Sequence, residues 1–150
     1  MLSKSALAAI FKRNGASGDH TRLYEDMRVE DRLVIESALD GVDVSGSPVV
    51  VSIFSPQDWS LIGTSTVIVS EHGHVIITPI VSIVRVQPRR KVNGIPIKKP
   101  LWTTLEVSRS DGIIVALRTD PGQPFVGVWN LLKTFEASAR REPDPKAQGS

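Results

Sequence analysis

The segment after Pro124 constrains the fold most, because its apolar residues recur at helical spacing. Pro124 itself suits a first helical turn, where a missing backbone N–H costs nothing. Positions i, i+3, i+4, i+7 and i+10 of the segment are apolar and form one stripe: Phe125, Val128, Trp129, Leu132 and Phe135. Such a stripe is typical of a helix that buries one side. The sequence therefore predicts a C-terminal amphipathic helix that covers a sheet.

The middle of the chain alternates β-rich segments with turn signals. Valine, isoleucine, threonine and tryptophan dominate these segments, which favours strands. The expected extended segments are 49–53, 59–69 with a bend at Gly63, 75–77, 80–86, 102–107 and 113–117. Turns are expected at 71–73, 93–94, 110–112 and 120–122, where glycine accompanies histidine, asparagine or aspartate. The pattern predicts a mainly β, α+β domain of antiparallel strands closed by the C-terminal helix.

The N-terminal third shows helical patterns in place of strand patterns. Residues 2–13 predict a short helix, 14–18 a flexible joint, and 22–39 a second helix that ends at Asp40-Gly41. The predicted organisation is a helix and joint at 1–18, a helical segment at 19–47, the β domain at 48–139 and a disordered polar tail at 140–150. Trp59, Trp102 and Trp129 are expected to share one core.

Composition limits the classes of protein that the chain can be. Its 150 residues are 41% apolar and 23% charged, which is typical of one globular domain. Cysteine is absent, which excludes disulfide scaffolds and thiolate chemistry and favours the cytoplasm. No apolar run approaches the roughly 18 to 20 residues that cross a bilayer.

Catalytic motifs are not found in the sequence. It contains no nucleophile elbow, P-loop, dinucleotide fingerprint or zinc-protease motif. His72 and His74 flank a turn glycine without a third ligand at a useful spacing, so a metal-dependent enzyme is the weaker alternative and exposed turn histidines are the preferred interpretation. Asp111 and Asp120 are assigned to turns, and Asp58 to a turn or the start of a strand. We expect a non-enzyme with no cofactor and no metal.

The basic residues gather in one part of the chain. No acid occurs between His72 and Leu105, whereas six cations do: Arg85, Arg89, Arg90, Lys91, Lys98 and Lys99. A hairpin at Asn93-Gly94 would bring two of these clusters together, where they could bind phosphate groups or an anionic membrane. The alternative is a solvated loop that prevents strand pairing. Nucleic acid is disfavoured, because no aromatic residue is interleaved for base stacking.

The arrangement resembles the pleckstrin-homology-like (PH-like) superfold, including its GRAM and bacterial branches. The resemblance rests on Asp58-Trp59 and the threonine-containing strand that follows, on Ile80-Val-Ser-Ile83, and on the closing hairpin and helix from Thr104 to Phe135, within about 48–139. It implies an antiparallel barrel or roll capped by a helix. In lipid-binding members the cations usually sit in the loop between the first two strands; here that loop, Ser55-Pro56-Gln57-Asp58, has none.

These observations predict a non-catalytic PH-like binding module. Its partner would be a protein or an anionic surface, such as a phosphoinositide or a membrane, engaged through the six basic residues. An alternative function is that of a bacterial immunity or inhibitor protein that binds a toxin, since the chain is compact, lacks an active site and has acids and bases in separate regions.

Overall fold

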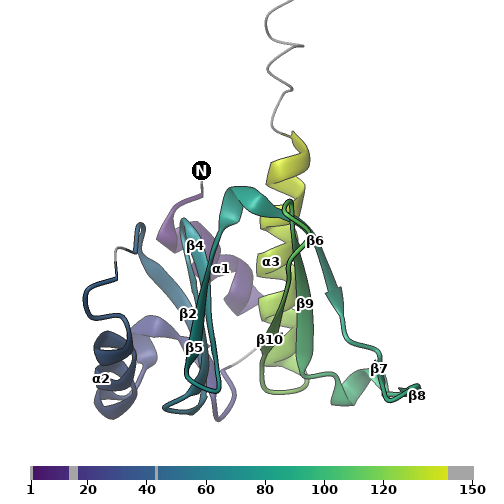
Figure 1. Ribbon diagram of the computed structural model, residues 1–150, viewed down its shortest axis with the longest axis horizontal. Helices are drawn as coiled ribbons and strands as arrows, with labels where there is room; N and C mark the ends of the chain where they lie inside the picture. Colours follow the sequence, from purple (N-terminus) through teal and green to yellow (C-terminus); the bar gives the residue numbers. More distant parts are fainter. Residues whose placement is uncertain (1, 14–16, 43, 142–150) are drawn as a thin grey trace, which may run out of the picture.

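A computed structural model describes residues 2–13, 17–42 and 44–141 (Figure 1). The elements, in chain order, are α1 (Lys4–Arg13), β1 (Thr21–Leu23), the 3-10 turn η1 (Tyr24–Asp26), α2 (Val29–Ala38), β2 (Pro48–Ser55), β3 (Asp58–Gly63), β4 (Thr66–Glu71), β5 (His74–Pro79), η2 (Ile80–Ser82), β6 (Ile83–Pro88), β7 (Lys91–Val92), β8 (Ile95–Pro96), η3 (Lys99–Leu101), β9 (Thr104–Arg109), β10 (Ile114–Arg118) and α3 (Gln123–Arg141). The predicted α+β class with antiparallel strands and a C-terminal helix is confirmed.

The strands form separate antiparallel sheets. Five strands pair in the order β1-β2-β3-β4-β5, three pair as β10-β9-β6, and β7 and β8 form a two-stranded hairpin. In Figure 1 the five-stranded sheet lies to the left, the three-stranded sheet to the right beside α3, and the small hairpin projects at the lower right. The β7–β8 hairpin therefore stands clear of the packed body.

Both faces of the five-stranded sheet are covered. One face carries Val50, Ile62 and Val67, which share register positions and pack with α1, α3 and the three-stranded sheet in the larger core. The other face carries Val51, Leu61 and Ile68, which pack with Met27 and Ile35 from the α2 region in a second core. Because successive strand residues point to opposite faces, neighbouring apolar residues are required here, and Val50 and Val51 of β2 meet that need, one in each core.

Helix α1 packs closely against α3 at Gly127 of α3. Leu7 and Phe11 lie one turn apart on α1 and are both buried, and Ser3 Oγ accepts the Ala6 N–H at the helix start. A Cβ added to Gly127 would lie 2.9 Å from Phe11 Cδ2 and 3.0 Å from the Phe11 carbonyl oxygen. The missing side chain at Gly127 thus allows the two helices to approach closely.

The predicted helix at 22–39 is wrong in its first half. Residues 21–23 form the edge strand β1, whose Thr21 and Leu23 pair with Ser52 and Val50 of β2 and are buried. The helix itself begins only at Val29. Burial of these two alternate side chains, with Leu23 in the larger core and the Thr21 hydroxyl hydrogen-bonded to Ser52, outweighs the weak helical periodicity of this segment.

Other expected elements differ less. The segment 59–69 is a hairpin, since β3 ends at Gly63 and β4 begins at Thr66. The first three residues of 80–86 form η2 rather than strand. Helix α3 continues to Arg141, past the expected start of the tail, and 142–150 lie outside the described residues, as do residues 14–16 of the expected joint.

The prediction that three tryptophans share one core is wrong. Trp59 is buried in the second core, on the side of α2. Trp102 and Trp129 are only partly buried, and their rings contact each other where Trp102 meets α3. The other stripe residues of α3, which are Phe125, Val128, Leu132 and Phe135, are buried as predicted, and so is Leu131. None of the described helices combines the length and apolar character that crossing a bilayer requires.

Candidate functional site

The most prominent surface feature is the hairpin arm, which we define as residues 90–101. Its strands pair Lys91 with Pro96 and Val92 with Ile95. The connecting Asn93 and Gly94 have φ angles of 51° and 78°. Positive φ at both central residues is the requirement of a tight I′ hairpin turn, which Asn-Gly meets with little strain. The predicted turn at 93–94 is confirmed.

Trp102 anchors the base of the hairpin arm. Its Nε1–H donates to the Ile97 carbonyl oxygen at 2.9 Å, and the Ile97 N–H donates to the Arg90 carbonyl oxygen at 2.7 Å. The guanidinium carbon of Arg90 lies 5.7 Å from the Trp102 ring centroid, within cation–π range. The arm is thus held at its base while its tip extends into solvent.

The arm concentrates cations that have no carboxylate partner. Arg90, Lys91, Lys98 and Lys99 are all exposed, and none of them forms an ion pair within the described ranges. Unpaired cations close together repel one another and attract anions. The electrostatic character of the arm is therefore that of an anion-binding surface.

The arm also exposes aliphatic side chains. Val92 is 51% exposed, Ile95 is 69% exposed and Leu101 is 62% exposed. Because directly paired strand residues share a face, Val92 and Ile95 lie together on one face of the hairpin and Lys91 lies on the other. The tip therefore combines an apolar pair with a surrounding set of positive charges.

The six sequence-predicted basic residues do not form one cluster. Arg90, Lys91, Lys98 and Lys99 lie together on the arm. Arg89 follows β6 and forms an ion pair with Glu106, its Nη2 lying 3.4 Å from Oε2. Arg85 lies near the other end of β6, about 13 Å from Arg89 at the usual rise of a strand. Arg85 is thus separated from the hairpin arm.

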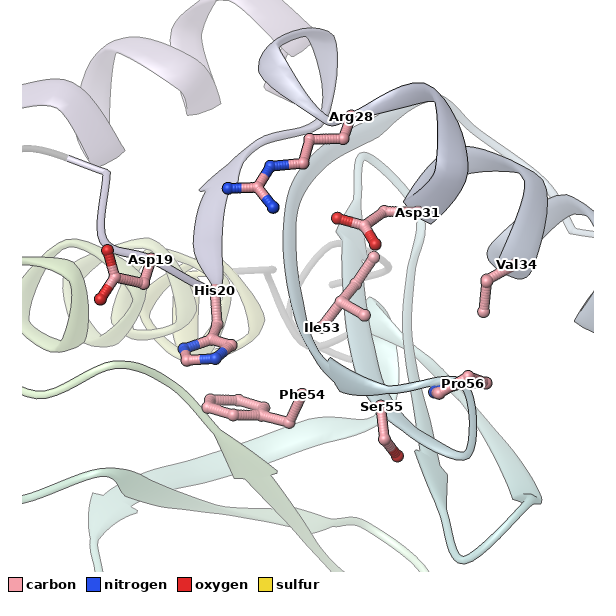
Figure 2. Close-up of a pocket in the computed structure, with 9 residues that line it drawn as sticks. All are labelled: Asp19, His20, Arg28, Asp31, Val34, Ile53, Phe54, Ser55 and Pro56. Carbon is pink, nitrogen blue, oxygen red and sulfur yellow. The ribbon is translucent and has the colours of Figure 1, made fainter.

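A second candidate site surrounds His20 (Figure 2). A pocket of about 440 Å³ is lined by residues that include Asp19, His20, Arg28, Asp31 and Phe54. The rings of His20 and Phe54 stack with centroids 4.6 Å apart. Figure 2 shows this stack below the charged groups, with the Arg28 guanidinium directed over the pocket. The charged side chains of the lining are Asp19, Asp31 and Arg28, so the pocket carries both signs of charge.

Asp120 holds His20 in place from the far end of the chain. Its Oδ1 lies 2.8 Å from His20 Nδ1, and its Oδ2 accepts the backbone N–H groups of His20 and Thr21 at 2.7 and 2.8 Å. Burial acts to raise the pKa of the Asp120 carboxyl, but these hydrogen bonds outweigh it and hold the pKa below its ordinary value of 3.8. The assignment of Asp120 to a simple turn missed this role, and no local sequence signal marks it.

The histidines at 72 and 74 serve the β4–β5 hairpin. His72 and Gly73 form its turn with φ angles of 51° and 81°. The His72 N–H donates to Asp58 Oδ1 at 3.1 Å, and this hydrogen bond lowers the pKa of Asp58. In the part of the chain that the structure describes, His, Asp and Glu side chains form no group of three or more that could hold a metal ion.

Comparisons with known proteins identified no relative of this chain. No protein-family model, curated protein or solved structure matches the chain.

Proposed function

We propose that this chain is a non-catalytic binding module of the PH-like type that docks on an anionic membrane surface through its hairpin arm. The observation that carries the proposal is the composition of the arm, in which exposed Val92 and Ile95 at the tip are bordered by Arg90, Lys91, Lys98 and Lys99, none of which forms an ion pair with another described residue. Binding through such a surface involves no chemical reaction, in keeping with a non-catalytic module.

A bilayer surface matches both parts of the arm, the cations and the apolar tip. Its phosphates and anionic head groups lie above an apolar region, and an interfacial element buries its apolar side chains about 5 to 10 Å into that boundary. Lysine and arginine side chains reach outward to the head groups while their stems stay in apolar surroundings. An extended protein partner would need an apolar pocket ringed by acids, a more specific requirement, so we favour the membrane.

The fold supports the PH-like part of the proposal. Strands β2 to β5 form a four-stranded meander, β6, β9 and β10 form a second antiparallel sheet, and α3 follows the last strand. Strand β10 lies against β3 and β4, which brings the two sheets together along one side. We interpret this four-plus-three arrangement as an open roll of the PH-like kind, with β1, α1 and α2 added around it.

The proposal is tested by vesicle sedimentation with the full chain. We expect binding to vesicles that contain phosphatidylserine and not to pure phosphatidylcholine. Replacing Lys91 and Lys98 together by glutamine should weaken binding by about 2 kcal/mol, at about 1 kcal/mol per basic residue near an anionic surface, which is roughly 30-fold. Raising the salt concentration should weaken wild-type binding, because the attraction is screened.

The matched control replaces Lys4 and Lys12 by glutamine. Both are exposed on α1, away from the hairpin arm (Figure 1), and their loss changes the net charge equally. This variant should bind within about twofold of wild type if the site is local, since long-range charge effects are screened. Equal weakening by both pairs, or wild-type binding that does not depend on anionic lipid, would show that the arm is not the docking site.

A further inference from the structure

A groove opens beside the base of the hairpin arm. It has a volume of about 350 Å³ and lies between η3 and the start of α3. Most of its wall is apolar and comes from Pro100, Trp102, Phe125, Val126 and Trp129. This volume is at the lower end of the range of about 300 to 1,000 Å³ found for small-molecule sites. The groove therefore has room for one slender apolar group.

Three aromatic rings fix the shape of this groove. The centroid of Trp102 lies 6.3 Å from those of Phe125 and Trp129, and the latter two are 6.0 Å apart, all with steep interplanar angles of 57° to 70°. Edge-on packing of this kind is favourable and resists collapse. Since Trp102 also anchors the arm through Ile97, the groove and the arm are parts of one structure.

Cations border the groove. Arg90 lies over the Trp102 ring, and Lys133 Nζ lies 4.9 Å from the Trp129 ring centroid. Lys99 belongs to the lining itself, and none of the lining residues is acidic. An apolar channel with a cationic rim suits a ligand with an apolar chain and an anionic head.

We propose that this groove binds the upper acyl chain of one anionic phospholipid from the membrane on which the hairpin arm docks. The inference rests on the proposed function, because the membrane supplies the ligand. When the tip of the hairpin arm is inserted in the bilayer, the base of the arm stands at the level of the lipid head groups. The part of a lipid acyl chain nearest its ester bond can then reach the groove. The lipid phosphate lies near Lys99, which lines the groove, and near Arg90, which lies over the Trp102 ring.

Val126 offers a matched pair of variants to test the groove. Glutamate and glutamine have nearly the same size and helix propensity, so Val126→Glu and Val126→Gln differ mainly in charge. A carboxylate in the groove should exclude the anionic lipid, because burying it beside an acyl chain is costly. In sedimentation with phosphatidylserine-containing vesicles we expect Val126→Glu to bind about tenfold more weakly than Val126→Gln, with both folds checked by circular dichroism.

Tryptophan fluorescence reports occupancy directly. Anionic phospholipid brominated near the ester end of its chain should quench the fluorescence of wild type and of Val126→Gln more strongly than that of Val126→Glu. If the glutamate variant does not fold, Gln123→Trp fills the groove from an exposed position, and Gln123→Ala is its control. The filled variant should lose affinity about tenfold relative to the alanine variant.

The outcomes separate the two proposals. If wild type binds anionic vesicles but the paired variants bind alike and bromine does not quench, the groove proposal is wrong and docking by the arm stands. If wild type does not bind anionic vesicles, membrane docking is wrong and the lipid groove falls with it; an apolar side chain of a protein partner would then be the occupant to seek.

Discussion

Replacing Asp120 by alanine should lower the free energy of unfolding by about 3 kcal/mol, because it leaves buried donors without acceptors. The carboxylate accepts the N–H groups of His20 and Thr21 as well as the His20 ring, and Thr21 is fully buried. Chemical denaturation measures the loss. Asp40→Ala, at an exposed position after α2, is the control and should change stability by less than about 0.5 kcal/mol. Equal stability of the two variants would contradict the role of Asp120.

The same carboxylate makes stability depend on pH. The folded-state pKa of Asp120 is lowered, so the unfolded chain binds this proton more readily than the folded one. Its stabilisation is therefore complete above about pH 5, where the carboxyl is ionised in both states because the unfolded chain has a pKa of about 3.9, and it is lost as the pH falls through the lowered pKa. The stability difference between wild type and Asp120→Asn should shrink over that interval. A difference that is constant down to strongly acidic pH would contradict the lowered pKa.

Replacing Leu132 by alanine should lower the free energy of unfolding by about 2 to 5 kcal/mol, the range for a leucine deleted from a packed core. Leu132 is 0% exposed and lies in the larger core, which residues of α1, α3 and both sheets form together. The surrounding elements converge on α3 and cannot all move in to fill the space. Thermal or urea denaturation, with the measured helix content as a check on folding, gives the value.

Ser138→Ala is the control for that measurement. Ser138 is exposed near the end of the same helix, so its replacement should be neutral or slightly stabilising through helix propensity. A Leu132→Ala protein that loses less than about 1 kcal/mol would show that α3 is not the packing centre of the fold.

The parts of the fold that could be predicted depend on residues that lie close together in the sequence. The Asn93-Gly94 turn, the β9–β10 hairpin and the apolar stripe of α3 each depend on residues close in sequence, whose spacing or backbone preference is specific. The cationic character of the hairpin arm followed from the same local pattern. Its apolar tip did not, because Val92 and Ile95 resemble core residues until their exposure is known.

Long-range contacts account for what was missed. Strand β1 has three residues, too few for a periodic pattern, and exists because β2 offers an edge. The hydrogen bonds between His20 and Asp120 join residues 100 positions apart. The groove beside the arm needs Trp102 and Trp129 to meet, although they belong to different elements. No spacing rule connects such partners, so only the folded chain reveals them.

The close approach of α1 to Gly127 has a consequence for how the chain folds during synthesis. Leu7 and Phe11 leave the ribosome before their neighbours on α3, which are made more than a hundred residues later. At about 5 to 20 residues per second, these apolar side chains wait for seconds without a partner. A nascent chain stopped before Asp120 would also lack the carboxylate that accepts the Thr21 N–H. We therefore expect such chains to be sensitive to proteases and to require chaperones until the last helix emerges.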